Sequence, residues 1–431
     1  MAGGMDAFCL SFCVAIATTL VLTPAAARLA RLRRIVDVPG GRKTHSRLTP
    51  LLGGLSIFLG AAIPTAFFLL HAGAAASGGR PWLVAAAGAV LVLCLGIWDD
   101  ARDLRPRRKL AAQLAIALLV GVAGARVAAI DLPGSVRLGL GVASLPLTVL
   151  WITASMNAWN LIDGMDGLAA GLAALAAGLL GWRAAAAGEM ACAVLYLSLA
   201  GACLAFLRHN FHPASIFMGD CGSLFLGYVF AVGPLMAGQR VAGHGATGYG
   251  ATGYGAAGYA ATGYAGEGAA LDAAIPMLIL LLPIADMTAA VVRRARLFAR
   301  VRAAWGMPTW DVIRMVGAAD RRHVHHLLLA RGLGQRRAAI ALYGVALLLG
   351  GVAMARGPIA FQWAALAAGP LALGIFLLRL GCATPGSASR ARAATAPGAP
   401  IAATPPPMAG LRRPRPRQPR PHQPDERRSA A

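Results

Sequence analysis

Runs of roughly 20 apolar residues recur along the chain, and each is long enough to cross the hydrocarbon core of a bilayer. Of the 431 residues, 58% are hydrophobic and only 13% are charged. This pattern argues against an ordinary water-soluble domain and predicts an all-α polytopic membrane protein with about 11 transmembrane helices. The predicted spans are centred near residues 16, 60, 89, 120, 147, 176, 199, 227, 281, 347 and 369.

Lys and Arg predict the orientation, because these residues accumulate in cytoplasmic loops. Segments 28–50, 98–109, 206–215 and 293–337 and the tail from 379 contain 34 of the 40 Lys and Arg residues. We therefore expect the N-terminus outside and the C-terminus in the cytoplasm. The first span should be retained, because no basic residue precedes it as in a signal peptide. The net charge of +23 favours membrane lipids and anionic substrates over nucleic acid, since the cations flank apolar spans without interleaved aromatic residues.

Two segments are too low in complexity to build a core. Residues 245–264 repeat a five-residue unit of mainly Gly, Ala and Tyr, and we expect them to lie in a flexible outer loop, 239–270. Residues 383–431 are rich in Pro, Ala and Arg and predict a disordered basic cytoplasmic tail. The predicted membrane domain is therefore 1–382. The seven Cys residues include no C-x-x-C pair, which indicates neither a disulfide framework nor a zinc site.

The dense polar clusters all fall on the side assigned to the cytoplasm. In "WDDARDLRPRRKL", a continuing helix would place Asp99 and Asp103 on one face with Asp100 beside them. Carboxylates so close repel unless a cation, usually Mg²⁺, lies among them or one stays protonated. The alternative is an interfacial cap balanced by the cations of residues 105–109.

The stretch "NAWNLIDGMDGLAAG", residues 157–171, has Asn157, Asn160, Asp163 and Asp166 at steps of three. A helical turn would bring these four side chains near one side. Amides beside carboxylates suit a ligand with ring and sugar donors, such as a nucleoside, more than a bare metal ion.

In "NFHPASIFMGDCGSLFLG", residues 210–227, Asp220 stands at the mouth of a span without an obvious local cationic partner. It predicts either a site where acids gather around a metal ion or a helix cap. Asn210 and Phe217 could add a hydrogen bond and a stacking face.

Two basic loops complete the set. The first, "DVPGGRKTHSRLTPLLGG", carries Lys43; the second, "DRRHVHHLLLARG", carries His323, His325 and His326. The histidine spacing is not the i, i+4 pairing of a helical zinc site, so a cationic His cluster that binds phosphate fits better. Each loop could also be an ordinary positively charged cytoplasmic loop.

Together these clusters indicate phosphoryl transfer from a nucleotide to a lipid phosphate. Their order and wording, above all "NLIDGMDGLA" and "FMGDCGSLFLG", resemble the polyprenyl-phosphate N-acetylhexosamine-1-phosphate transferases over about residues 10–380. The interrupted H-x-H-H resembles the branch that uses undecaprenyl phosphate and N-acetylglucosamine. The chain departs from the family in Leu48, where proline is common, and in lacking a Ser-Pro-Phe run before the histidines, which bears on the sugar.

The resemblance implies transfer of a sugar 1-phosphate from a UDP-sugar to undecaprenyl phosphate at the cytoplasmic face of the bacterial inner membrane. UMP would leave, and the product would start a cell-envelope glycan such as that of lipopolysaccharide. It implies Mg²⁺, with Mn²⁺ as the alternative, and leaves a homodimer open. The implied catalytic residues are Asp99, Asp100 and Asp220, of which Asp100 and Asp220 would hold the metal. The implied nucleotide-sugar residues are Lys43, Asn160, Asp163, Asp166, Asn210, Phe217, His323, His325 and His326.

Three alternatives remain at this level. A phospho-N-acetylmuramoyl-pentapeptide transferase of peptidoglycan synthesis would share most of these motifs. An intramembrane Mg²⁺-dependent prenyltransferase would show two separated DxxxD-type motifs and would not need the histidine loop. An ion-coupled transporter would carry its acids near mid-span rather than at one face.

Overall fold

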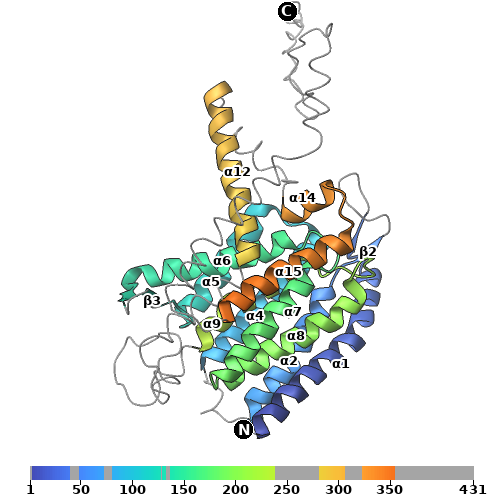
Figure 1. The fold of residues 1–431 in the computed structure, drawn as a ribbon, viewed down its shortest axis with the longest axis vertical. Coiled ribbons are helices and arrows are strands. Elements are labelled where there is room, and N and C mark those ends of the chain that lie inside the picture. The colour runs from blue at the N-terminus through green and yellow to red at the C-terminus, as the bar shows by residue number, and fades with distance from the viewer. Residues whose placement is uncertain are drawn as a thin grey trace, which may run out of the picture. The chain divides into compact units, whose positions relative to one another are not determined.

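The computed structural model describes residues 2–38, 48–71, 80–127, 129–132, 136–237, 281–305 and 323–354. Lys43, the Gly/Tyr repeat and the basic tail lie outside these ranges. Most of the described residues are helical, as the apolar runs predict (Figure 1). The helices are α1 Ala2–Leu32, α2 Gly53–His71, α4 Arg80–Arg102, α5 Pro106–Val122, α6 Ser144–Ile162, α7 Leu168–Ala186, α8 Met190–Asn210, α9 Gly219–Ala237, α12 Leu281–Trp305, α14 Val324–Ala330 and α15 Gln335–Met354.

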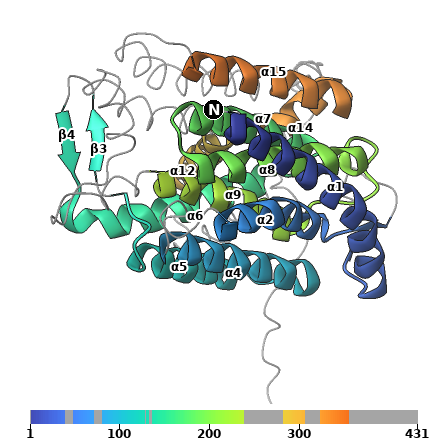
Figure 2. The same ribbon diagram turned by 90° about the horizontal axis from the view of Figure 1, so that it is seen from below.

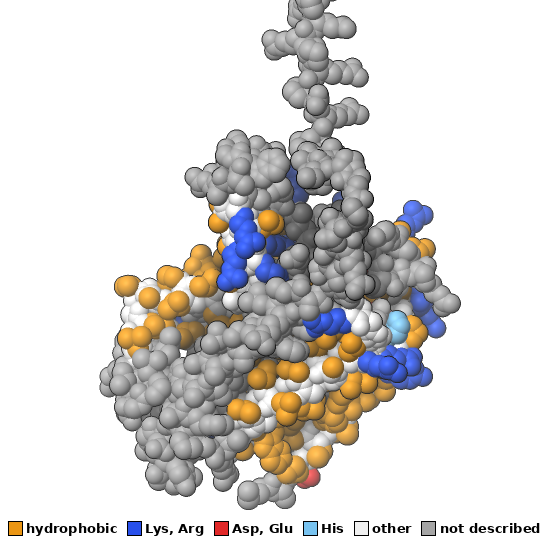
Figure 3. Space-filling model, turned by 45° about the horizontal axis from the view of Figure 1, so that its top comes forward, with side chains coloured by type: hydrophobic (Ala, Val, Ile, Leu, Met, Phe, Trp, Pro, Cys, Tyr) orange, Lys and Arg blue, Asp and Glu red, His pale blue; other side chains and the backbone are white. Residues whose placement is uncertain are grey.

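Among the described helices, seven are long and apolar enough to cross a membrane. They correspond to the predicted spans near residues 16, 60, 89, 147, 176, 199 and 227. On the face seen in Figure 3, hydrophobic side chains cover much of the described helical surface, and Lys and Arg gather toward one end of it. Many large hydrophobic side chains are exposed on these helices, as lipid contact requires.

Two short antiparallel ribbons depart from the all-α prediction. In the first ribbon, β1 (Val36–Asp37) pairs with β2 (Thr49–Pro50) between α1 and α2. In the second, β3 (Ala129–Leu132) pairs with β4 (Val136–Gly139) between α5 and α6. A turn of 3₁₀ helix, Gly141–Ala143, follows this second ribbon and precedes α6. Pairing satisfies backbone groups where the chain leaves the helices, and a hydropathy pattern does not reveal it.

Helix α9 lies at the centre of the bundle, where 94% of its most apolar window is buried, against 17% for α1. It packs against α2, α4 and α6, while α8 packs against α1, α2 and α7. Figure 2 shows α15 over α7 on one side and α4 with α5 on the other. A Cβ on Gly54 of α2 would overlap the backbone of Gly222 on α9, so this contact requires glycine.

Short connections bring the polar clusters to one end of the bundle. Helices α4, α6 and α8 end there, and α5, α7 and α9 begin there after connections of a few residues. Helix α1 also ends near this point, and α2 starts from it. The polar clusters identified in the sequence therefore face a common region, although they are widely separated along the chain.

Candidate active site

Asp100 joins the end of α4 to the start of α9. Its carboxylate accepts the backbone N–H groups of Asp220 at 2.8 Å and Cys221 at 3.1 Å. The first N–H groups of a helix have no partner within it, and the positive end of the helix dipole favours a carboxylate there. Asp100 thus fixes the position from which Asp220 projects.

Lys109, in the first turn of α5, lies between Asp99 and Asp220. Its ammonium is 2.8 Å from Asp99 Oδ2 and also forms an ion pair with Asp220. Asn160 on α6 donates to Asp220 Oδ1 at 2.6 Å. Asp220 has no cationic partner close to it in the sequence, and Lys109, its partner in the structure, comes from another helix. Charged groups taken out of water need such pairing.

Asp103 does not join these acids, and the prediction that it shares a helix face with Asp99 is wrong. Helix α4 ends at Arg102, and Asp103 has a φ of 49°, a left-handed conformation that an Asp tolerates. Its side chain is exposed. The turn lets Leu104 donate its N–H to Asp99 Oδ1 at 2.8 Å, which holds Asp99 from the opposite side to Lys109.

The predicted helical run from Asn157 to Asp166 is also interrupted, because α6 ends at Ile162 and α7 starts at Leu168. Asn157 does not face the site: its amide donates to Gln113 Oε1 on α5 at 2.7 Å. Asp166 lies 2.7 Å from His212 Nδ1 and accepts the N–H of Ala214 at 3.1 Å. Of these four residues, only Asn160 both belongs to α6 and lines the cavity described below.

Asn210, at the end of α8, hydrogen-bonds to the turn at 163–167, which contains Asp163 and Asp166. It accepts the N–H of Gly167 at 3.1 Å and donates to the carbonyl of Ile216 at 3.0 Å, while its side chain is almost fully buried. Phe217 is positioned by its backbone, which donates to the carbonyl of Pro50 at 2.9 Å. Both residues border the cavity described below.

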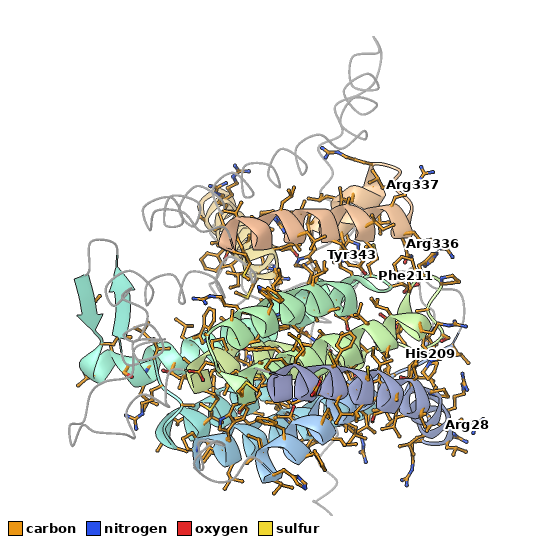
Figure 4. All side chains as sticks on the ribbon, turned by 60° about the horizontal axis from the view of Figure 1, so that its bottom comes forward. Arg28, His209, Phe211, Arg336, Arg337 and Tyr343 are labelled. Carbon is orange, nitrogen blue, oxygen red and sulfur yellow. The ribbon has the colours of Figure 1, made fainter. Side chains whose placement is uncertain are left out.

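Helix α15 holds the same turn from outside. Tyr343 donates to the carbonyl of Gly167 at 2.7 Å, and Arg336 donates to the carbonyl of His212 at 2.9 Å. Figure 4 shows Tyr343 between α15 and α7, and Arg336 beside the end of α8 where Phe211 lies. The turn at 163–167 is therefore fixed from two helices, α8 and α15.

The three histidines occupy different environments. His323 and His325 are buried, whereas His326 borders the cavity. Burial, the adjacent His326 and the nearby His323 lower the pKa of His325 to about 3, despite the opposing charge of Asp286. His325 is therefore neutral at physiological pH, and the prediction of a cationic three-histidine cluster is wrong for this member.

These segments enclose a cavity of 390 Å³. Asp99 lies behind the wall, paired with Lys109, and His323 and His325 lie behind His326. Asp37, Leu51, Gly164, Met165 and Gly219 complete the wall. The predicted residues that line the cavity are Asp100, Asn160, Asp163, Asp166, Asn210, Phe217, Asp220 and His326.

Asp163 is buried in the cavity wall close to other acids. Burial comes first, and the charges of Asp220, Asp100 and Asp166 add to it, so that together they raise the pKa of Asp163 to about 8. A perturbed carboxyl in a cavity is typical of a functional site. Within the described ranges, no group of three or more His, Cys, Asp or Glu residues is arranged to hold a metal ion by itself.

Sequence reasoning missed two residues here. Lys109 is one of several cations at 105–109, and the sequence pattern does not distinguish it from the others. Asp286, which contacts His323, lies outside the five polar clusters. A lone acid inside an apolar run, as in "LPIADMTAA", is itself a signal, because such residues are costly in a membrane unless they are paired.

Seven apolar helices with an acidic cavity at one end of the described bundle define the class of polytopic membrane proteins with a polar ligand site. The family model for glycosyl transferase family 4 matches residues 82–238. A protein of Bacillus subtilis (strain 168), named a probable undecaprenyl-phosphate N-acetylglucosaminyl 1-phosphate transferase, is 33% identical over 77% of this chain and 80% of its own length. The chain therefore belongs to glycosyl transferase family 4.

Two further relatives differ in the sugar for which they are named. The decaprenyl-phosphate N-acetylglucosaminephosphotransferase of Mycolicibacterium smegmatis is 31% identical over 72% of each chain. The phospho-N-acetylmuramoyl-pentapeptide-transferase of a Synechococcus species is 35% identical, but over 48% of this chain and 61% of its own length. The similarity to proteins named for N-acetylglucosamine thus extends over more of the chain.

Proposed function

We propose that this protein transfers N-acetylglucosamine 1-phosphate from UDP-N-acetylglucosamine to undecaprenyl phosphate, releasing UMP. The observation that carries the proposal is the cavity in which the separate polar segments at Asp100, 160–166, 210–220 and His326 converge. Its acids, amides and aromatic side chain are the groups that a nucleoside diphosphate sugar and a divalent ion would need. The long match to relatives named for N-acetylglucosamine supports this sugar over muramoyl pentapeptide.

In the reaction, an oxygen of the lipid phosphate forms a bond to the β-phosphorus of the UDP-sugar. The bond from that phosphorus to the bridging oxygen breaks, and UMP leaves with the electron pair. Lys109 supplies positive charge next to Asp99 and Asp220, where phosphate oxygens would approach. Asn160 and Asp163 line the part of the cavity where the nucleoside would lie. Direct attack and a phospho-enzyme on an aspartate are both compatible with these positions.

The donor set fits Mg²⁺, or Mn²⁺, because these ions prefer oxygen ligands and are usually held by one or two carboxylates together with substrate phosphates. Asp100 and Asp220 would hold the ion. Asp163, whose carboxyl accepts no hydrogen bond from the described residues, is a further acid of the cavity wall beside these two. When bound, the ion would reduce the charge that repels an anionic attacker.

The distribution of Lys and Arg supports a cavity on the cytoplasmic side of the bacterial inner membrane, with the N-terminus outside. The same rule, with the apolar runs outside the described ranges, supports about 11 spans. The product would start an envelope glycan, such as that of lipopolysaccharide or another cell-wall polymer. Whether two copies associate is a separate proposal that oligomeric-state measurements in detergent can test.

A panel of UDP-sugars tests the function. Purified protein would receive undecaprenyl phosphate, Mg²⁺ and, in turn, UDP-N-acetylglucosamine, UDP-N-acetylgalactosamine, UDP-glucose and UDP-N-acetylmuramoyl-pentapeptide. We expect UMP and a lipid-linked pyrophosphate with the first sugar. UDP as the nucleotide product, or turnover with the muramoyl pentapeptide alone, would contradict the proposal.

A further inference from the structure

Asp286 is a buried carboxylate outside the cavity that holds two groups of one segment. It lies in α12 and is 1% exposed. Its Oδ2 is 2.9 Å from His323 Nδ1, and its Oδ1 accepts the N–H of Val324 at 2.9 Å. Because a carboxylate can only accept, His323 Nδ1 carries the proton in this pair. Both oxygens of Asp286 are thus directed at the start of α14.

Helix α14 depends on this contact for its N-terminal cap. The residue at the N-cap position, His323, makes no side-chain hydrogen bond to the helix. Most helices begin with a local Ser, Thr, Asp or Asn that accepts one of the first N–H groups. Here Asp286 accepts the N–H of Val324 from another helix, 38 positions earlier in the chain. The position of α14 is therefore tied to α12 rather than to its own sequence.

The segment held in this way forms part of the cavity wall. His325 packs so closely on Gly164 that a Cβ on this glycine would overlap its ring. The rings of His325 and His326 are 4.3 Å apart between centroids, and His326 lines the cavity together with Asp163 and Asp166. A shift at the start of α14 would therefore move His326 relative to Asp163.

We propose that Asp286 is a positioning residue, which orients His326 toward a nucleotide-sugar in the cavity through His323 and the cap of α14. Asp286 itself touches neither the cavity nor the substrate. The inference rests on the proposed function, because it assigns His326 to the donor side of the reaction. It predicts an effect on the UDP-sugar and none on the binding of the lipid acceptor.

The substitution Asp286→Asn tests this inference, since it keeps the side-chain volume and the acceptor for Val324 but removes the charge and the second acceptor. We expect the KM for UDP-N-acetylglucosamine to rise about tenfold, with the KM for undecaprenyl phosphate unchanged, as for loss of ground-state binding of one substrate. Thr288→Val on the same helix is the matched control, because within the described residues its exposed hydroxyl donates a hydrogen bond only to the carbonyl of Ile284 on its own helix. A KM for the UDP-sugar equal to that of the wild type would overturn the inference.

A double-mutant comparison separates positioning from general destabilisation. His326→Ala should raise the same KM, and Asp286→Asn added to it should raise it by less than about threefold more, because residues acting through one another are not additive. Full multiplication of the two effects, or a fall in kcat with both KM values unchanged, would contradict positioning. If Asp286→Asn yields too little folded protein, His323→Gln answers the same question: it keeps Asp286 and the cap, and an unchanged KM for the UDP-sugar would overturn the inference.

The wild-type assay separates failure of the proposed function from failure of the proposed role of Asp286. Absence of UMP release from every UDP-sugar by folded wild-type protein would reject the proposed function and this inference with it. Normal wild-type turnover with unaltered kinetics in Asp286→Asn would reject the inference alone.

Discussion

Asp100 on α4 accepts the backbone N–H of Asp220 on α9 at 2.8 Å, so that the two acids occupy one site although 120 positions separate them in the chain. The contact ties the end of one helix to the start of another. It makes the position of Asp220 depend on Asp100, whose carboxylate accepts N–H groups that have no partner within the first turn of α9. The same site contains Lys109, which provides the first prediction.

Replacement of Lys109 by Met should lower the rate of UMP release by more than about 100-fold, because Asp99 and Asp220 would then face each other without a cation. Arg108→Met is the matched control, since this exposed neighbour forms no ion pair with Asp99 or Asp220 in the described structure. We expect it to remain within about threefold of the wild type. Initial rates with saturating UDP-N-acetylglucosamine measure both. Equal rates for the two variants would contradict this role for Lys109.

The pKa of Asp163 predicts a pH-dependent stability. Its pKa in the folded protein is about 8, above the ordinary value of 3.8, so the folded state binds this proton more tightly than the unfolded chain does. The contribution of this group to stability is therefore complete below pH 3.8, and it is lost progressively as the pH rises from there to about 8.

In EDTA, the melting temperature of the wild type should thus fall between about pH 4 and pH 8 more steeply than that of Asp163→Asn. Mg²⁺ should reduce the difference, because a cation favours the charged carboxylate. The exposed Asp103→Asn should follow the wild type. Parallel curves for wild type and Asp163→Asn would show that the proton on Asp163 does not contribute.

Gly164→Ala should reduce activity, because a Cβ at this position overlaps the ring of His325 and must displace α14 or the turn at 163–167. We expect a loss of about tenfold or more in kcat/KM for the UDP-sugar. Gly178→Ala on α7 is the control, because no atom of the described residues lies within 4 Å of a Cβ added there. Alanine also favours the helix over glycine. Activity equal in the two variants would argue against close packing of the histidine segment on the turn.

Deletion of residues 245–264 should leave UMP release within about twofold of the wild type, because so many Gly and Ala residues cannot form a packed core. These residues lie outside the described ranges, so the prediction rests on sequence alone. Membrane insertion would be checked by cell fractionation before the assay. Loss of turnover in a correctly inserted variant would assign this repeat a role in catalysis.

The sequence predicted most of the cavity, because its signals are local. Apolar runs located the helices, and the charge distribution placed the acids, amides and histidines at span ends on one side. The pairing of Lys109 with Asp99 and Asp220 could not be predicted, since several neighbouring cations were equally available in the sequence. Only the direction of α5 selects Lys109 among them.

Local breaks in helical structure explain the other errors. The steps of three from Asn157 to Asp166 suggest one helix, but α6 ends at Ile162, and the turn that follows is fixed by Asn210 and Tyr343 from distant segments. Asp103 likewise lies outside the helix, because it adopts a left-handed backbone conformation itself. Tertiary contacts override a short periodic pattern when they satisfy the backbone in another conformation.

The most direct test of the central claim compares four aspartates of the same chain. UMP release from UDP-N-acetylglucosamine would be measured in membranes supplied with undecaprenyl phosphate, for Asp99→Asn, Asp100→Asn, Asp220→Asn and the exposed Asp103→Asn. The account predicts that each of the first three falls by more than about 100-fold while Asp103→Asn stays within about twofold of the wild type. Near-normal turnover in the first three would contradict the claim that the converging acids perform the transfer.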